Sequence, residues 1–66
     1  MFDELENGQE YYFISTNFYV VGFFTEKKND VIHLSKGHFH YTQSKELVPC
    51  DDIVLDINQL IGYAKT

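Results

Sequence analysis

The chain has 66 residues, a formal net charge of −5 at pH 7 and a single cysteine, Cys50. A chain this short forms one small domain (1–66) that buries only about 60% of the surface exposed on unfolding, so its net stability is marginal. One cysteine excludes an internal disulfide and fits a reducing environment. The sequence contains no arginine, the usual bidentate partner of phosphate, so its composition disfavours nucleic acid as the main partner.

The N-terminal residues do not have the pattern of a signal peptide. Residues 1–8 carry acidic side chains where a signal peptide requires basic ones. No apolar run approaches the roughly 20 residues that a transmembrane helix needs. We therefore expect a cytoplasmic protein with no membrane partner.

The charge is unevenly distributed along the chain. Residues 1–26 hold five acids and no lysine, whereas residues 27–45 hold four lysines and all three histidines. Acids dominate again between residues 46 and 56. A basic middle with acidic flanks favours head-to-tail self-assembly or capture of a small anion. A mixed, solvated surface is the alternative.

The first predicted elements are a short helical turn and a strand. Residues 2–7 can form one helical turn that stops at Gly8, with Phe2 and Leu5 packed on the rest of the fold. Residues 10–16 are rich in aromatic and β-branched side chains, which is typical of a β-strand.

The strand predicted from Phe18 onwards is apolar on both faces, with Gly22 at a position where it can bend. In a small soluble protein one face of a sheet meets water, so the second apolar face requires a cover. Either the N-terminal turn or a second subunit provides it, and we expect the subunit. The side chains expected to mediate this self-association face outward: Tyr12, Tyr19, Val21 and Phe23.

A tight turn at residues 27–30 joins this strand to the next, because Asn and Asp tolerate the left-handed backbone of a hairpin turn. In the following strand, residues 31–41, the inward side chains change from even to odd positions. One extra residue at Lys36–Gly37, a bulge with the glycine in the left-handed conformation, restores the alternation. A second hairpin at residues 35–37 is the alternative. With the bulge, three histidines share the outward face: His33, His38 and His40.

The last third of the chain contains shorter elements. Residues 46–48 can pair briefly before Pro49, which cannot donate to a ladder and marks a sheet edge or the start of a strand. Residues 53–57 form a clear strand, residues 58–60 one tight helical turn, and residues 61–65 a last strand. The pattern predicts an all-β fold, a small and strongly bent five-stranded barrel with a short N-terminal helical turn.

Three stretches together resemble a known type of protein: residues 11–22 (YYFISTNFYVVG), 30–42 (DVIHLSKGHFHYT) and 53–64 (IVLDINQLIGYA). Their size, order and spacing resemble those of short bacteriophage and prophage proteins with a small Sm-like β-barrel. The strand pattern by itself also fits a barrel of the Src-homology type. This resemblance implies a phage-encoded protein that acts in the host cell cytoplasm, and it implies no enzymatic activity. In one respect the chain departs from Sm proteins, which carry an Arg-Gly or Lys-His pair for RNA contacts in a late strand. The last strands here, IVLDI and IGYAK, have neither pair, which puts an RNA role in doubt.

The histidines are the first candidate site. His38 and His40 lie about 7 Å apart along one strand face, a workable pair for zinc or nickel with His33 as a third ligand. No paired-cysteine spacing accompanies them, so we predict no metal site. We expect instead an exposed strand face or a subunit interface, which would be sensitive to pH between about 6 and 7.

No catalytic set is predicted. Asp51 and Asp52 are adjacent in sequence and would point to opposite faces of a strand, so they could not share a proton. Cys50 would need an activating histidine to act as a nucleophile, and a half-buried free thiol is the simpler interpretation. We therefore predict that the protein is not an enzyme and uses no cofactor.

The predicted function is binding. We expect a non-enzymatic, self-associating protein that binds or inhibits a host factor, such as a component of host defence, or that sequesters a small anionic ligand between subunits. An Sm-like ring that binds RNA is the alternative. The side chains expected to contact the ligand or partner lie in the middle segment: Lys27, Lys28, His33, Lys36, His38, His40 and Tyr41.

Overall fold

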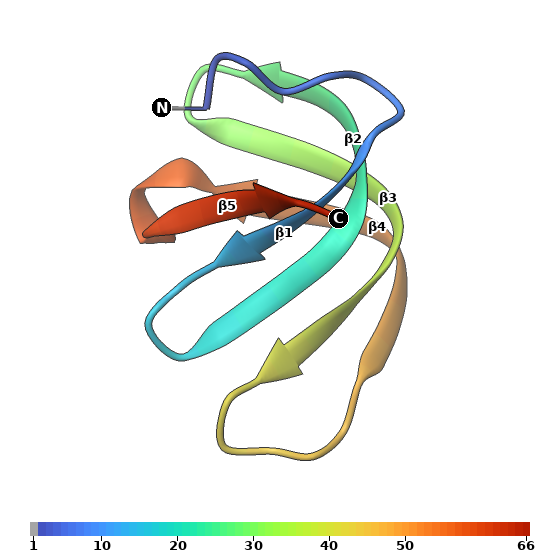
Figure 1. The fold of residues 1–66 in the computed structure, drawn as a ribbon, viewed down its shortest axis with the longest axis vertical. Helices are drawn as coiled ribbons and strands as arrows, with labels where there is room; N and C mark the ends of the chain where they lie inside the picture. Colours follow the sequence, from blue (N-terminus) through green and yellow to red (C-terminus); the bar gives the residue numbers. More distant parts are fainter. Residues whose placement is uncertain (1) are drawn as a thin grey trace.

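The computed structural model describes residues 2–66 as one antiparallel β-sheet of five strands (Figure 1). The strands are β1 (Glu10–Ile14), β2 (Phe18–Lys28), β3 (Val31–Tyr41), β4 (Val48–Asp56) and β5 (Gly62–Lys65), and the 3₁₀ helix η1 (Ile57–Gln59) lies between the last two. Their order in the sheet is β4-β3-β2-β1-β5. The predicted all-β class and the five predicted strands are confirmed.

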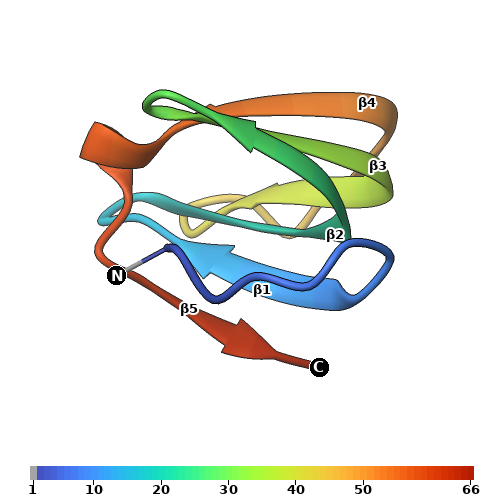
Figure 2. The ribbon, with the colours of Figure 1, turned by 90° about the horizontal axis from the view of Figure 1, so that it is seen from above.

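The sheet is strongly curved but is not closed into a barrel (Figure 2). Within residues 2–66, β4 pairs only with β3, and β5 pairs only with β1. After β4 the chain crosses the open end through η1, and the Ile61 N–H donates to the Ile14 carbonyl at 2.8 Å. Among these residues β4 and β5 do not pair with each other, so no strand pairing joins the two edges of the sheet. Closure of the predicted barrel is therefore not observed.

A bulge in β3 helps to produce this curvature. Where β3 advances from Ser35 to His38, its partner strand β2 advances by one residue fewer. Lys36 has the left-handed backbone, with a φ of 49°, and a Cβ at Gly37 would lie 1.8 Å from the Val21 carbonyl oxygen. The predicted bulge is confirmed and the alternative hairpin is excluded. The prediction that Gly37 takes the left-handed conformation was wrong, because Lys36 takes it. Gly37 is required for a different reason: the backbone of β2 lies too close to leave room for a side chain there.

The later elements differ from their predicted bounds. β4 continues through Pro49 as one strand. Its place at the edge of the sheet permits this, because the free side of an edge strand needs no N–H donor. The helical turn begins one residue earlier than predicted, at Ile57, since the Asp56 carboxylate accepts a hydrogen bond from the Asn58 N–H at 2.9 Å.

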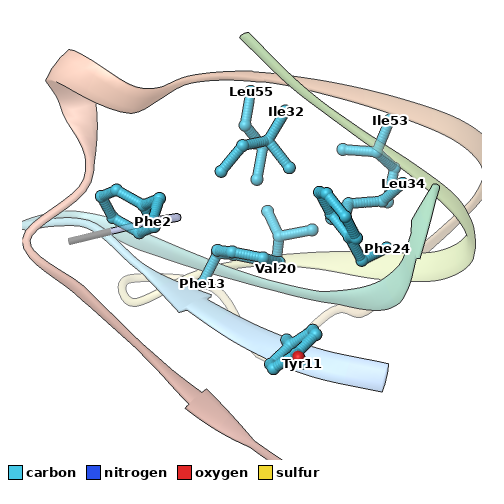
Figure 3. Close-up of a cluster of buried hydrophobic side chains, with 9 residues drawn as sticks. All are labelled: Phe2, Tyr11, Phe13, Val20, Phe24, Ile32, Leu34, Ile53 and Leu55. Atoms are coloured by element: carbon cyan, nitrogen blue, oxygen red, sulfur yellow. The ribbon is translucent and has the colours of Figure 1, made fainter. Parts of the chain in front are cut away.

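The hydrophobic core lies between the two halves of the curved sheet (Figure 3). Its nine buried side chains are Phe2, Tyr11, Phe13, Val20, Phe24, Ile32, Leu34, Ile53 and Leu55. Phe13, Val20 and Ile32 are fully shielded from solvent. Since strand side chains alternate between faces, the residues between these positions point to the opposite side of the sheet.

The N-terminal segment forms two turns, at residues 3–4 and 7–8, and not the predicted helical turn. The Gly8 N–H donates to the Phe24 carbonyl and the Phe24 N–H donates to the Gln9 carbonyl, at 2.8 and 2.9 Å. These long-range bonds hold the chain in turns beside β2. Phe2 packs in the core, with ring centroids 6.4 Å from Phe13 and 5.3 Å from Tyr63, so its predicted packing role is confirmed.

Candidate binding surface

The side of the sheet opposite the core, the outer face, carries most of the predicted interface residues. Val21 of β2 is paired with Tyr12 of β1 and with His38 of β3, so these three side chains form one row across the sheet. A second row contains Ile14, Tyr19 and His40. We call these six side chains together with Phe23 the outer aromatic patch.

Ring contacts hold the outer aromatic patch together. The Tyr19 ring lies 6.1 Å from Tyr12, 6.5 Å from His38 and 4.9 Å from His40, measured between centroids. Val21 is only 6% exposed and forms the floor of the patch, whereas Tyr12 and Phe23 remain 42% and 38% exposed. The N-terminal segment packs on the core side through Phe2, so within residues 2–66 no segment covers the patch.

The histidines divide between two parts of the outer face. His38 and His40 contact Tyr19, while His33 is paired with Glu26 nearer the β2–β3 hairpin. The His40 Nδ1 atom is buried and has no hydrogen-bond partner among the described residues. In the part of the chain that the structure covers, no three His, Cys, Asp or Glu side chains come close enough to hold a metal ion.

The lysines and Tyr41 do not join the histidines in one site. Lys27 forms an ion pair with Asp3, with 3.5 Å between Nζ and Oδ1. Lys28 lies at the hairpin, where it is paired with Val31, and Lys36 is exposed at the bulge about 16 Å further along β3. Tyr41 ends β3 and contacts core-side rings, Phe18 at 6.4 Å and Phe39 at 4.8 Å. The seven predicted contact residues therefore occupy several separate places on one subunit.

Two other features of the sequence lie on β4. Asp51 and Asp52 are both exposed. The thiol of Cys50 is half-buried, and its Sγ lies 3.6 Å from the Val48 carbonyl oxygen.

The structure adds hollows at the open end of the sheet that we did not predict. One of about 460 Å³ lies between the β1–β2 turn and η1, and an adjoining one of about 400 Å³ shares Asn17 and Tyr41 with it. A third, of about 290 Å³, is lined by Tyr12, Ile14 and Tyr19 and so belongs to the outer aromatic patch. Small polar residues in turns are usual, so the sequence carried no signal for the first two hollows.

Comparison with known proteins assigns no family to the chain. The sequence matches no family model and no curated protein. Between residues 2 and 66 there is no helix long and apolar enough to cross a membrane.

Proposed function

We propose that the protein is a non-enzymatic binding protein that self-associates through the outer aromatic patch. One observation carries this proposal: a contiguous apolar surface on β1, β2 and β3 has two exposed aromatic side chains, Tyr12 and Phe23, and is left uncovered by every described segment. Soluble monomers rarely expose large contiguous apolar surfaces, and aromatic side chains are enriched at protein interfaces.

A second copy of the chain is the occupant that fits this patch best. A domain of this size has little core to stabilise it and gains from self-association. No side chain of the patch itself is an acid or a lysine, and Glu10, the β1 partner of Phe23, lies at its margin, so two copies can meet with few like charges in the interface.

The partner beyond the second copy is proposed from the resemblance to small phage proteins, which points to a host factor. The anionic-ligand and RNA alternatives draw less support from the geometry of one subunit. A fourth hollow, of about 460 Å³, contains Lys27 and is also lined by Asp3 and Asp30, whose carboxylates oppose the binding of an anion.

The test measures mass by light scattering after size-exclusion chromatography. For the unmodified chain we expect a mass of two or more times 7.8 kDa. For Phe23→Lys we expect the mass of the monomer, because the lysine places a charge in the interface. Leu47→Lys is the matched control, because Leu47 is also exposed but lies in the loop before β4. A monomeric unmodified chain, or equal masses for the two variants, would rule out the proposed interface.

A further inference from the structure

The two adjoining hollows at the open end of the sheet form what we call the neutral recess. Residues of η1 and of the turn between β1 and β2 line it. These two segments lie on the same side of the molecule (Figures 1 and 2). Its polar lining consists of amide and hydroxyl side chains, among them Ser15, Thr16, Asn17, Tyr41, Asn58 and Gln59. The second hollow extends this lining with Gln43 and Ser44.

Hydrogen bonds fix the three chain segments that surround the recess. The β1–β2 turn is closed by a bond of 2.9 Å from the Ser15 N–H to the Phe18 carbonyl. The Thr42 N–H donates to the Asn17 carbonyl at 3.1 Å and ties the end of β3 to this turn. The Ile61 N–H, bonded to the Ile14 carbonyl at 2.8 Å, places the segment after η1 on the third side. The recess is therefore largely preformed, as small-molecule sites usually are.

The recess is electrically neutral. Among residues 2–66, no charged side chain lines either hollow, although 23% of the residues in the chain are charged. An ionic ligand would lose water there without gaining a counter-charge, which is costly. Nucleotides and other phosphate esters are disfavoured for this reason, and η1 with its three residues is too short to supply a helix dipole.

Ser15 adds a second observation that points to a polar ligand. The residue is only 8% exposed, lines the recess, and its hydroxyl has no hydrogen bond to the described residues. This hydroxyl still reaches solvent, so a ligand that can both donate and accept can take the place of its water.

We propose that the neutral recess binds an uncharged saccharide. Amide and hydroxyl side chains each supply donors and acceptors, and this matches a ring of sugar hydroxyls, each of which donates and accepts. The C–H face of a sugar can lie against the ring of Tyr41, which is 53% exposed at the boundary shared by the two hollows. Their volumes of about 460 and 400 Å³ are within the usual range for small-molecule sites. This site differs from the outer aromatic patch but adjoins it, because Ser15 and Phe18 line both the recess and the third hollow.

The side-chain amides of the protein provide an internally controlled test by proton–nitrogen NMR. Asn17, Gln43, Asn58 and Gln59 line the recess, whereas Asn7, Gln9 and Asn29 lie elsewhere. We expect titration with neutral saccharides (glucose, galactose, N-acetylglucosamine and their disaccharides) to move the first group of signals and leave the second group in place. Glucuronate, the charged counterpart of glucose, should bind more weakly than glucose.

A pair of variants then locates the site. Gln59→Ala should weaken saccharide binding about fivefold, the usual effect of losing one hydrogen bond, while Gln9→Ala should leave it unchanged. The proposal is overturned if no saccharide in the panel moves the recess amides, if both groups of amides move equally, or if adenosine or uridine moves the recess amides and the saccharides do not.

Discussion

Gly37 shows how one residue permits the sharp bend of the sheet. A Cβ at this position would lie 1.8 Å from the Val21 carbonyl oxygen and 2.8 Å from the Gly22 Cα, and both are backbone atoms that no side-chain rotation can move. We expect Gly37→Ala to destabilise the fold by about 3 kcal/mol or more, because the two strands must separate to accept the methyl group. Urea denaturation monitored by circular dichroism measures this loss.

Gly62→Ala is the matched control for this prediction. A Cβ at Gly62 meets no atom within 4 Å, and its backbone is not in the left-handed region. We expect its free energy of unfolding to change by less than about 1 kcal/mol. A Gly37→Ala protein as stable as Gly62→Ala would show that β2 and β3 are not in close backbone contact at the bulge.

The bulge also shows which features of a residue can be read from the sequence. The change of inward parity between Leu34 and Phe39 locates the extra residue, because alternation in a strand has a period of two. Which of Lys36 and Gly37 takes the left-handed conformation depends on how closely β2 approaches. That approach is a tertiary contact, so no local pattern predicts it.

At the scale of elements, the strands and the tight turn before the last strand were predictable, whereas the N-terminal segment and the neutral recess were not. β2 and β3 each have strong aromatic and β-branched alternation, which decides their structure locally. Residues 2–9 instead form turns because of their bonds to Phe24, sixteen residues after Gly8. The neutral recess combines residues 15–18, 41–44 and 58–61, and only the assembled sheet brings them together.

The pairing of β2 with β3 places two histidines in the outer aromatic patch, which predicts pH-dependent self-association. His38 and His40 both contact Tyr19, and protonation of an imidazole adds a positive charge. Two charged imidazoles in an apolar interface are unfavourable, so protonation of these side chains should favour the monomer. Light scattering at about pH 7.5 and at about pH 5.5 tests for this change.

Substitution of the histidines tests the cause. The double variant His38→Gln, His40→Gln should lose the pH dependence, while His33→Gln should keep it because His33 is paired with Glu26 away from Tyr19. A mass that is independent of pH in the unmodified chain, or a pH dependence that survives in the double variant, contradicts a role of these histidines in the interface.

At the scale of the whole molecule, two features of this sheet favour association. Among residues 2–66, its edge strands β4 and β5 each leave one side without a strand partner, which a closed barrel would avoid, and its outer face carries apolar side chains outside the core. Pro49 blunts the β4 edge, and β5 has only four residues, so both edges are poor templates for pairing. The outer aromatic patch has no such protection, which is why we assign self-association to the face and not to the edges.

If the outer aromatic patch is an interface, the stability of the fold must depend on protein concentration. Association that occurs only between folded chains stabilises them by mass action, so the midpoint of thermal unfolding should rise as the protein is concentrated. Phe23→Lys should remove this dependence and leave the lower midpoint of the isolated subunit, whereas Leu47→Lys should retain it. Thermal scans over a hundredfold range of concentration compare the three proteins. A midpoint that stays constant in the unmodified chain would mean that a single subunit is stable with its aromatic face in water, and the patch would then have to serve a different partner.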